Sequence, residues 1–268
     1  MTRNARNGHV SLKETEMYYA AIGHGKRILV VLPGLSDGLA TVQGKALLLA
    51  APYRRFFERY TVYLFSRKNQ MHAGYSIRQM AEDQAEAIRK LNLSKVSVLG
   101  VSEGGMIAQY LAIDHPELVE KMILAVSAPE ANVIVRERVS HWIELVKEND
   151  YKQLMADTAE KSYSESYLHK NRAILPILGI FGKPKSFERF LVNAEAILAF
   201  NAKDEINQII CPTLIIGGSD DQIVGVEASY LMHDLIGKST LYIYEGLGHA
   251  TYEEADDFYD RVFSYLDE

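Results

Sequence analysis

Gly100-Val101-Ser102-Glu103-Gly104 is the stretch that decides the fold of this 268-residue chain. The segment before it, residues 95–99, is short, apolar and rich in β-branched residues, which is typical of a buried strand. The segment after it, residues 105–112, follows a helical pattern. A serine on a sharp strand-to-helix turn projects its hydroxyl out of the sheet, and glycines permit the cramped backbone of such a turn. The stretch therefore predicts Ser102 as a nucleophile.

Strand and helix patterns alternate on both sides of this turn. Short apolar segments predict further strands at residues 17–22, 28–32, 61–65, 122–126, 213–217 and 240–244. Helical periodicity predicts helices at residues 76–91, which Ser76 can cap, at residues 227–235, and near the end of the chain, where Tyr259, Val262 and Leu266 share a face. This alternation is typical of an α/β fold with a mostly parallel central sheet and helices on both faces.

The alternation stops between residues 128 and 210, where the pattern is helical and aromatic. We predict a core formed by residues 1–127 and 211–268, with residues 128–210 inserted as a helical cap over the site. Ligand pockets are lined mainly by apolar and aromatic groups, so Trp142, Tyr163 and Tyr167 are candidate substrate-binding residues. For any one aromatic residue, packing inside the cap is the simpler explanation. The other aromatic candidates are Tyr151, Phe181, Phe187, Phe190 and Phe200.

The composition narrows the class of protein. The formal net charge of −6 argues against nucleic-acid binding, which needs a basic surface. We expect no membrane span, because no apolar stretch approaches the ~20 residues that one needs. The basic N-terminus precedes no apolar region, so we expect a cytoplasmic protein. The single cysteine, Cys211, cannot form an intrachain disulfide, and no residue cluster has metal-ligand spacing, so we expect neither a metal nor a cofactor.

Ser102 needs partners, because serine is a weak nucleophile at neutral pH and requires a base that an acid in turn orients. The base candidate is His249, in a glycine-rich loop between the last predicted strand and the last helix. The acid candidates lie after predicted strands. They are Asp221, its neighbour Asp220, and Glu130.

With these residues in place, the chain resembles the α/β-hydrolase-fold enzymes over essentially its whole length. The resemblance is carried by the Ser102 turn, the segment around Asp221, and Gly248-His249, in the family's order of serine, acid and histidine. It favours Asp221 over Asp220 and Glu130 as the acid. It therefore implies a catalytic triad of Ser102, His249 and Asp221.

The same resemblance implies an oxyanion hole formed by the backbone N–H groups of Leu35 and Glu103. The family usually has His-Gly ahead of the first of these residues, whereas this chain has Pro33-Gly34. Pro33 removes only its own N–H, so the hole can be retained. Having Pro33 in place of the usual histidine affects the packing and width of the loop after the strand at residues 28–32. We expect the Glu103 side chain to be solvated or capping, and Arg67 to be paired structurally.

These features predict a serine hydrolase that acts on a small carboxylic ester or related acyl substrate through an acyl-enzyme. Two alternatives use the same fold. One is a carbon–carbon bond hydrolase or lyase with the same triad, and the other is a ligand-binding receptor with little turnover. The expected partner is a small-molecule acyl substrate, and a homo-oligomer is left open.

Overall fold

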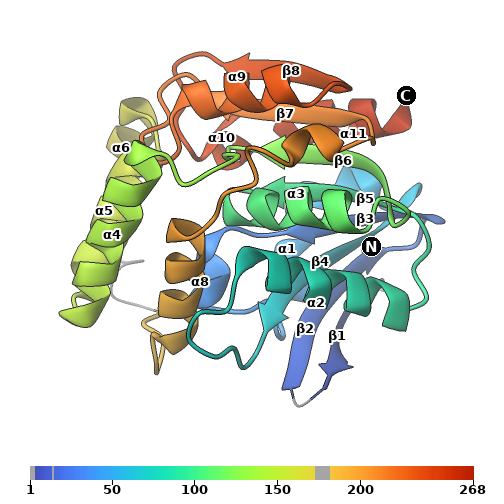
Figure 1. The fold of residues 1–268 in the computed structure, drawn as a ribbon, viewed down its shortest axis with the longest axis horizontal. Helices are drawn as coiled ribbons and strands as arrows, with labels where there is room; N and C mark the ends of the chain where they lie inside the picture. Colours follow the sequence, from blue (N-terminus) through green and yellow to red (C-terminus); the bar gives the residue numbers. More distant parts are fainter. Residues whose placement is uncertain (1–3, 14, 173–181) are drawn as a thin grey trace.

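The computed structural model describes residues 4–13, 15–172 and 182–268, and a single eight-stranded sheet forms its centre (Figure 1). The order of the strands across the sheet is β1-β2-β4-β3-β5-β6-β7-β8. Strand β2 runs antiparallel to both of its neighbours, and the remaining neighbouring pairs are parallel. The predicted α/β fold with a mostly parallel sheet is therefore confirmed. The strands are β1 (Ala5–Leu12), β2 (Thr15–Gly23), β3 (Arg27–Leu32), β4 (Tyr60–Lys68), β5 (Val96–Val101), β6 (Val119–Ala125), β7 (Thr213–Gly218) and β8 (Ser239–Tyr244).

The central strands are apolar on both sides because helices cover both faces of the sheet. In β3, Leu29 and Val31 join one buried cluster while Val30 and Leu32 join the other. This alternation follows from the two-residue period of a strand. Because helices bury both faces of a parallel sheet, side chains on both sides of these strands must be apolar. The strands are therefore nearly continuous apolar runs in the sequence.

Two layers of helices provide this cover (Figure 1). The helices packed on one face are α2 (Ile77–Lys90), α3 (Glu103–Asp114) and α9 (Val226–Leu235). The elements on the other face are α1 (Ala46–Leu49), η2 (Ala51–Phe56) and α11 (Phe258–Asp267). Helix α2 begins as predicted, because the Ser76 hydroxyl accepts the N–H of Gln79 at 3.2 Å and the Gln79 side chain accepts the N–H of Ser76 at 2.9 Å.

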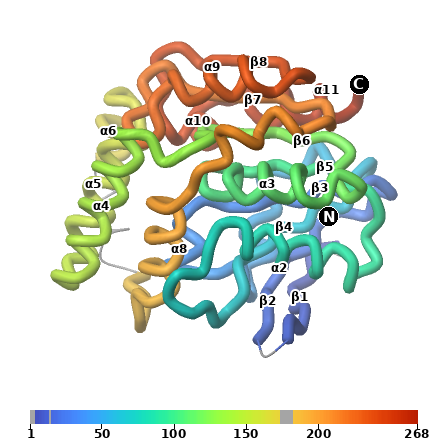
Figure 2. The backbone as a smooth tube through the Cα atoms, in the orientation of Figure 1, coloured from blue at the N-terminus to red at the C-terminus, as the bar shows by residue number. Residues whose placement is uncertain are grey.

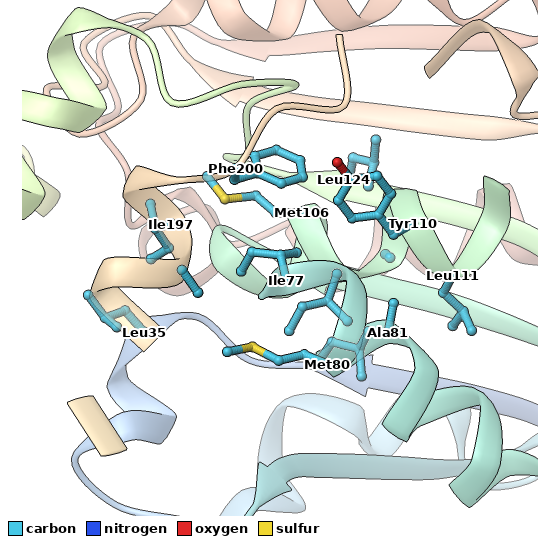
Figure 3. Packing of buried hydrophobic residues seen from close by; sticks show 14 of the residues in the cluster. Leu35, Ile77, Met80, Ala81, Met106, Tyr110, Leu111, Leu124, Ile197 and Phe200 are labelled. Carbon is cyan, nitrogen blue, oxygen red and sulfur yellow. The ribbon is translucent and has the colours of Figure 1, made fainter. Parts of the chain in front are cut away.

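A helical segment connects β6 to β7 and stands at one end of the sheet (Figures 1 and 2). Its helices are α4 (Val133–Lys147), α5 (Tyr151–Ser162), α6 (Glu165–Asn171) and α8 (Glu188–Leu198). Helix α8 packs against α4 and against the short helix η1 (Leu35–Gly38). Figure 3 shows Leu35 of η1 near Ile197 of α8, within the buried cluster that also holds Met80 of α2. The helical segment therefore contacts the loop that follows β3.

Two short elements, η3 (Ile206–Gln208) and α10 (Thr251–Glu254), complete the described chain. Phe181, one of the aromatic residues predicted for the cap, lies outside the described residues, as do residues 1–3 of the basic N-terminus. Within the described ranges, no helix has both the length and the apolar character that crossing a bilayer requires.

Candidate active site

Ser102 lies at the junction of β5 and α3, with a backbone φ of 53° and ψ of −119°. Such a positive φ is unusual for a residue other than glycine and marks local strain. The neighbouring glycines are required by close packing, because a Cβ at Gly104 would lie 2.0 Å from the carbonyl oxygen of Leu32. The carbonyl of Ser102 accepts hydrogen bonds from the Ser127 hydroxyl and the Gly105 N–H, both at 2.8 Å. These contacts hold the turn.

His249 lies in the loop between β8 and α10, with its imidazole facing Ser102. Its Nε2 atom is 2.9 Å from the Ser102 Oγ. The loop approaches the end of β7 closely, since a Cβ at Gly218 would lie 2.3 Å from the carbonyl oxygen of Leu247. The loop is also tied to the helical segment, because the N–H of Ala250 donates to the carbonyl of Ser162 at 2.9 Å. The imidazole is thereby brought over the serine.

Asp221, in the loop after β7, contacts the other nitrogen of the ring. Its Oδ2 atom lies 2.8 Å from His249 Nδ1, while its Oδ1 accepts the N–H groups of Ile223 and Val224 at 2.8 and 2.9 Å. Burial acts to raise the pKa of this carboxyl, but the charge of His249 and these hydrogen bonds outweigh burial and hold the pKa below its ordinary value. An ionised Asp221 accepts a hydrogen bond from the N–H at Nδ1, which leaves Nε2 free to accept a hydrogen bond from the Ser102 hydroxyl.

The two alternative acids, Asp220 and Glu130, have partners other than His249. Asp220 is exposed and accepts the hydroxyl of Ser219 at 2.7 Å. Glu130 forms an ion pair with Lys203 at 2.8 Å. Of the three candidates, Asp221 is the one that the structure brings to His249.

The loop after β3 passes directly beside Ser102. A Cβ at Gly34 would lie 3.3 Å from the Cβ of Ser102, so the backbone that carries Leu35 into η1 runs against the serine. On the other side, Glu103 is the first residue of α3. The N–H of a first helical residue has no acceptor within its helix, and the helix dipole makes this end attractive to negative charge. Both predicted oxyanion-hole residues therefore adjoin Ser102.

The expectation that the Glu103 side chain is solvated or capping is wrong. The side chain is fully buried, and its Oε2 atom lies 2.7 Å from Nη2 of Arg67, which is 1% exposed. Burial, together with the negative charge of Asp37, raises the pKa of Glu103 to about 7, although Arg67 and Arg189 act in the opposite direction. The expected structural pairing of Arg67 is confirmed. A helix first turn is usually solvated, but here the end of β4 and η1 close over it.

The three aromatic candidates for substrate binding make contacts within the helical segment and with α10. Trp142 is buried, and its indole N–H donates to Asp157 at 2.7 Å. Tyr163 stacks on Tyr167 with the ring centroids 4.4 Å apart, and its hydroxyl donates to Glu253 of α10. Their role toward a substrate stays a prediction.

A surface hollow of about 530 Å³ lies beside η1, but no triad residue lines it. Lys45, Asn69 and Arg189 contribute to its wall together with the apolar Leu39 and Ala40. The hollow is therefore separate from the contact between Ser102, His249 and Asp221. Among the described residues, no three His, Cys, Asp or Glu side chains gather where they could hold a metal ion.

Comparison with known proteins agrees with this architecture. A family model described as the alpha/beta hydrolase fold matches residues 27–256. The chain is 23% identical over 188 residues to a 3-oxoadipate enol-lactonase 2 of Acinetobacter baylyi, covering 70% of each chain. It is 25% identical over 183 residues to the 2-hydroxy-6-oxo-6-phenylhexa-2,4-dienoate hydrolase of Comamonas testosteroni, covering 66% of this chain and 64% of that one.

A solved structure of similar shape is that of an alpha/beta hydrolase enzyme from a Medee basin deep-sea metagenome library. Its TM-score is 0.86 at 17% identity, covering 97% of this chain and 98% of that one. The predictions of the fold family and of an enzyme are thereby confirmed. The chain belongs to the α/β hydrolase fold family.

Proposed function

We propose that the protein is a serine hydrolase that cleaves a small carboxylic ester or related acyl substrate. The observation that carries this proposal is the continuous contact from Ser102 through His249 to Asp221, at 2.9 and 2.8 Å. These are hydrogen-bonding distances between a nucleophile, a base and an orienting acid. The similarity to an enol-lactonase supports an acyl substrate, because a lactone is a cyclic ester.

In the proposed reaction, the Ser102 Oγ attacks the carbonyl carbon of the substrate while His249 Nε2 takes the hydroxyl proton. Asp221 holds the imidazole in the required tautomer and stabilises its charged form. His249 then gives the proton to the leaving alcohol, which departs and leaves an acyl group on Ser102. A water molecule, deprotonated by His249, releases the acid and restores the serine.

The tetrahedral intermediate carries a negative oxygen, for which we propose the N–H groups of Leu35 and Glu103 as donors. The approach of the Gly34 backbone to Ser102, and the position of Glu103 at the start of α3, support this role. One such donor is worth about 10²–10³ in kcat in comparable enzymes.

We further propose that residues 128–210 act as a cap, with residues 1–127 and 211–268 as the core. Two contacts support this arrangement. Helix α8 packs on η1, and Ser162 at the end of α5 accepts the N–H of Ala250, beside His249. The helical segment thus contacts the loops on both sides of Ser102, where it can limit the size of the acyl group.

The test is a panel of p-nitrophenyl esters, lactones, thioesters and amides assayed with the wild type and with Ser102→Ala. We expect turnover of a short ester and its loss on the order of 10⁶-fold in the variant. Full activity of Ser102→Ala on the best substrate would refute the mechanism. A burst that stops after one equivalent of product would favour a receptor of the same fold.

A second candidate function is hydrolysis of a carbon–carbon bond by the same triad. The similarity to the phenylhexadienoate hydrolase favours it, since that protein is named for a substrate of this kind. A 2-hydroxy-6-oxo-dienoate included in the panel separates the two. Turnover of this compound exceeding that of every ester would favour the second candidate.

A further inference from the structure

Four charged side chains form a buried cluster behind the proposed oxyanion hole, and the triad does not use them. They are Asp37 of η1, Arg67 of β4, Glu103 of α3 and Arg189 of α8, and we call them the charge network. Asp37, Arg67 and Glu103 are each no more than 2% exposed. Arg189 is the most accessible member, with 19% of its side chain exposed.

One side of the charge network holds η1. The Asp37 Oδ2 accepts the backbone N–H of Arg67 at 2.9 Å and lies 2.9 Å from Nη2 of Arg189. Arg189 also donates to the Asp37 carbonyl at 2.6 Å and to the Arg67 carbonyl at 3.1 Å. One guanidinium therefore fixes both the backbone and the side chain of Asp37, two residues after Leu35. The fork of an arginine suits such a role because its donors are rigidly arranged.

The other side of the charge network holds the start of α3. The Glu103 carboxyl lies 2.7 Å from Arg67, whose guanidinium is also 3.9 Å from Asp37. Arg67 thus stands between the acid on η1 and the acid on α3. Because these groups are buried, their mutual attraction is weakly screened, and the loss of one leaves a charge without compensation.

Helix α8 is close enough to act through this cluster. A Cβ at Gly38 would lie 2.8 Å from the Cα of Phe190, so the backbones of η1 and α8 are in contact beside Arg189. Arg189, which joins the helical segment to Asp37, therefore directly precedes a residue in this close contact.

From this arrangement we propose that the charge network positions the two oxyanion-hole amides and couples them to helix α8 through Arg189. The proposal rests on the proposed function, since it assigns the amides of Leu35 and Glu103 to the oxyanion. In this reading Arg189, Asp37 and Arg67 are positioning residues that do not touch the substrate. A shift of α8 then changes the rate of the chemical step without changing the affinity for the ester.

The experiment compares the wild type with Arg189→Gln, Arg189→Lys and Arg55→Gln. Arg55 is the matched control, because it is an exposed arginine of η2 that pairs with Asp260 at 2.6 Å, on the face of the sheet opposite α8. For each variant we measure kcat and KM with p-nitrophenyl butyrate, and hydrogen exchange of peptides that cover residues 33–40 and 101–106.

We expect Arg189→Gln to lower kcat by about tenfold or more, and by less than the loss of one whole oxyanion-hole donor would. KM should stay within twofold of the wild type. Exchange of residues 33–40 should become faster. Arg189→Lys should recover part of kcat, because an ammonium can still reach the Asp37 carboxylate, and Arg55→Gln should match the wild type. If Arg189→Gln does not fold, a lower kcat and a faster exchange of residues 33–40 in Arg189→Lys than in the wild type carry the test.

The proposal is overturned if a folded Arg189→Gln keeps kcat and the exchange of residues 33–40 within twofold of the wild type. A rise in KM with unchanged exchange would also overturn it, since that result would assign Arg189 to substrate contact. Absence of ester turnover in the wild type would instead count against the proposed function. The exchange comparison still decides whether Arg189 holds η1 in that case.

Discussion

At the scale of single residues, the site depends on which atoms of one carboxylate face which donors. Both oxygens of Asp221 are used, one by the His249 ring and the other by the amides of Ile223 and Val224. The two amides fix the carboxylate in the loop, so its remaining oxygen holds the imidazole. A carboxylate in this position is needed for its orientation as much as for its charge.

Replacing Asp221 with Asn tests this role. An amide can donate to Nδ1 and so favour the wrong tautomer of His249, and we expect kcat to fall on the order of 10⁴-fold, as in a comparable triad. Steady-state kinetics with a p-nitrophenyl ester measure the loss. Asp220→Asn is the matched control, since Asp220 is exposed, and it should stay within twofold of the wild type. Equal losses in both variants would contradict the assignment of the acid.

At the scale of secondary-structure elements, the turn from β5 to α3 is held by close backbone approach. A Cβ at Gly104 would meet the carbonyl oxygen of Leu32 in β3, and one at Gly100 would lie 2.5 Å from the carbonyl oxygen of Gly104. The neighbouring strand and the helix therefore leave no room for side chains at these positions. The turn thus combines two glycines that close packing requires with a positive φ at Ser102.

We expect Gly104→Ala to destabilise the protein by roughly 1–3 kcal/mol or more, because its Cβ would collide with backbone that cannot move independently. Gly237→Ala is the control, since nothing lies within 4 Å of a Cβ there. Urea denaturation of both variants measures the difference. A Gly104→Ala protein as stable as Gly237→Ala would show that β3 can yield to the methyl group.

The sequence predicts best the elements whose apolar residues follow one clear pattern, either a continuous apolar run or a helical period. The interior strands appear as apolar runs, and helix α2 has both its periodicity and its Ser76 cap in the sequence. Strand β1 could not be predicted in this way. It is the edge of the sheet, its Arg6, Asn7 and Gly8 are polar or small, and its pairing with β2 provides the order. An edge strand with one exposed side lacks the continuous apolar run of a central strand.

The residues of the candidate site that stand in local motifs could be predicted from the sequence, whereas contacts between distant elements could not. Ser102 and His249 stand in short glycine-rich stretches that local backbone geometry explains. The strand pattern alone leaves Asp221, Asp220 and Glu130 open, because each follows a predicted strand. The family resemblance favours Asp221, and it is the Asp221 carboxylate that lies 2.8 Å from His249 Nδ1. The pairing of Glu103 with Arg67 could not be predicted from the sequence either, because the two residues lie on different elements and no local pattern connects them.

At the scale of the whole molecule, the charge network links stability to pH. The ordinary pKa of a glutamate is 4.5, and in the folded protein the pKa of Glu103 is raised to about 7. Between these two pH values the folded chain binds more protons at this site than the unfolded chain does. The contribution of Glu103 to the free energy of unfolding therefore falls as the pH rises through this range.

Glu103→Gln cannot titrate and resembles the protonated state. We expect the free energy of unfolding of this variant to rise relative to that of the wild type as the pH goes from about 5 to 8. Since one pKa unit corresponds to about 1.4 kcal/mol, the rise should be a few kcal/mol at most. Urea denaturation at several pH values measures this difference. A constant difference across the range would mean that Glu103 is already ionised at pH 5 in the folded protein.

The contact between Ser102 and His249 also has a consequence for the order of folding. The two residues are 147 positions apart, and Arg189 and Asp37 are 152 apart. Closing such long loops is slow compared with forming a helix or a local strand pair. In the proposed triad, Ser102 therefore gains its base only when the turn after β5 and the loop after β8 are in place together. By this proposal, a partly unfolded chain holds a serine without a base and does not transfer acyl groups.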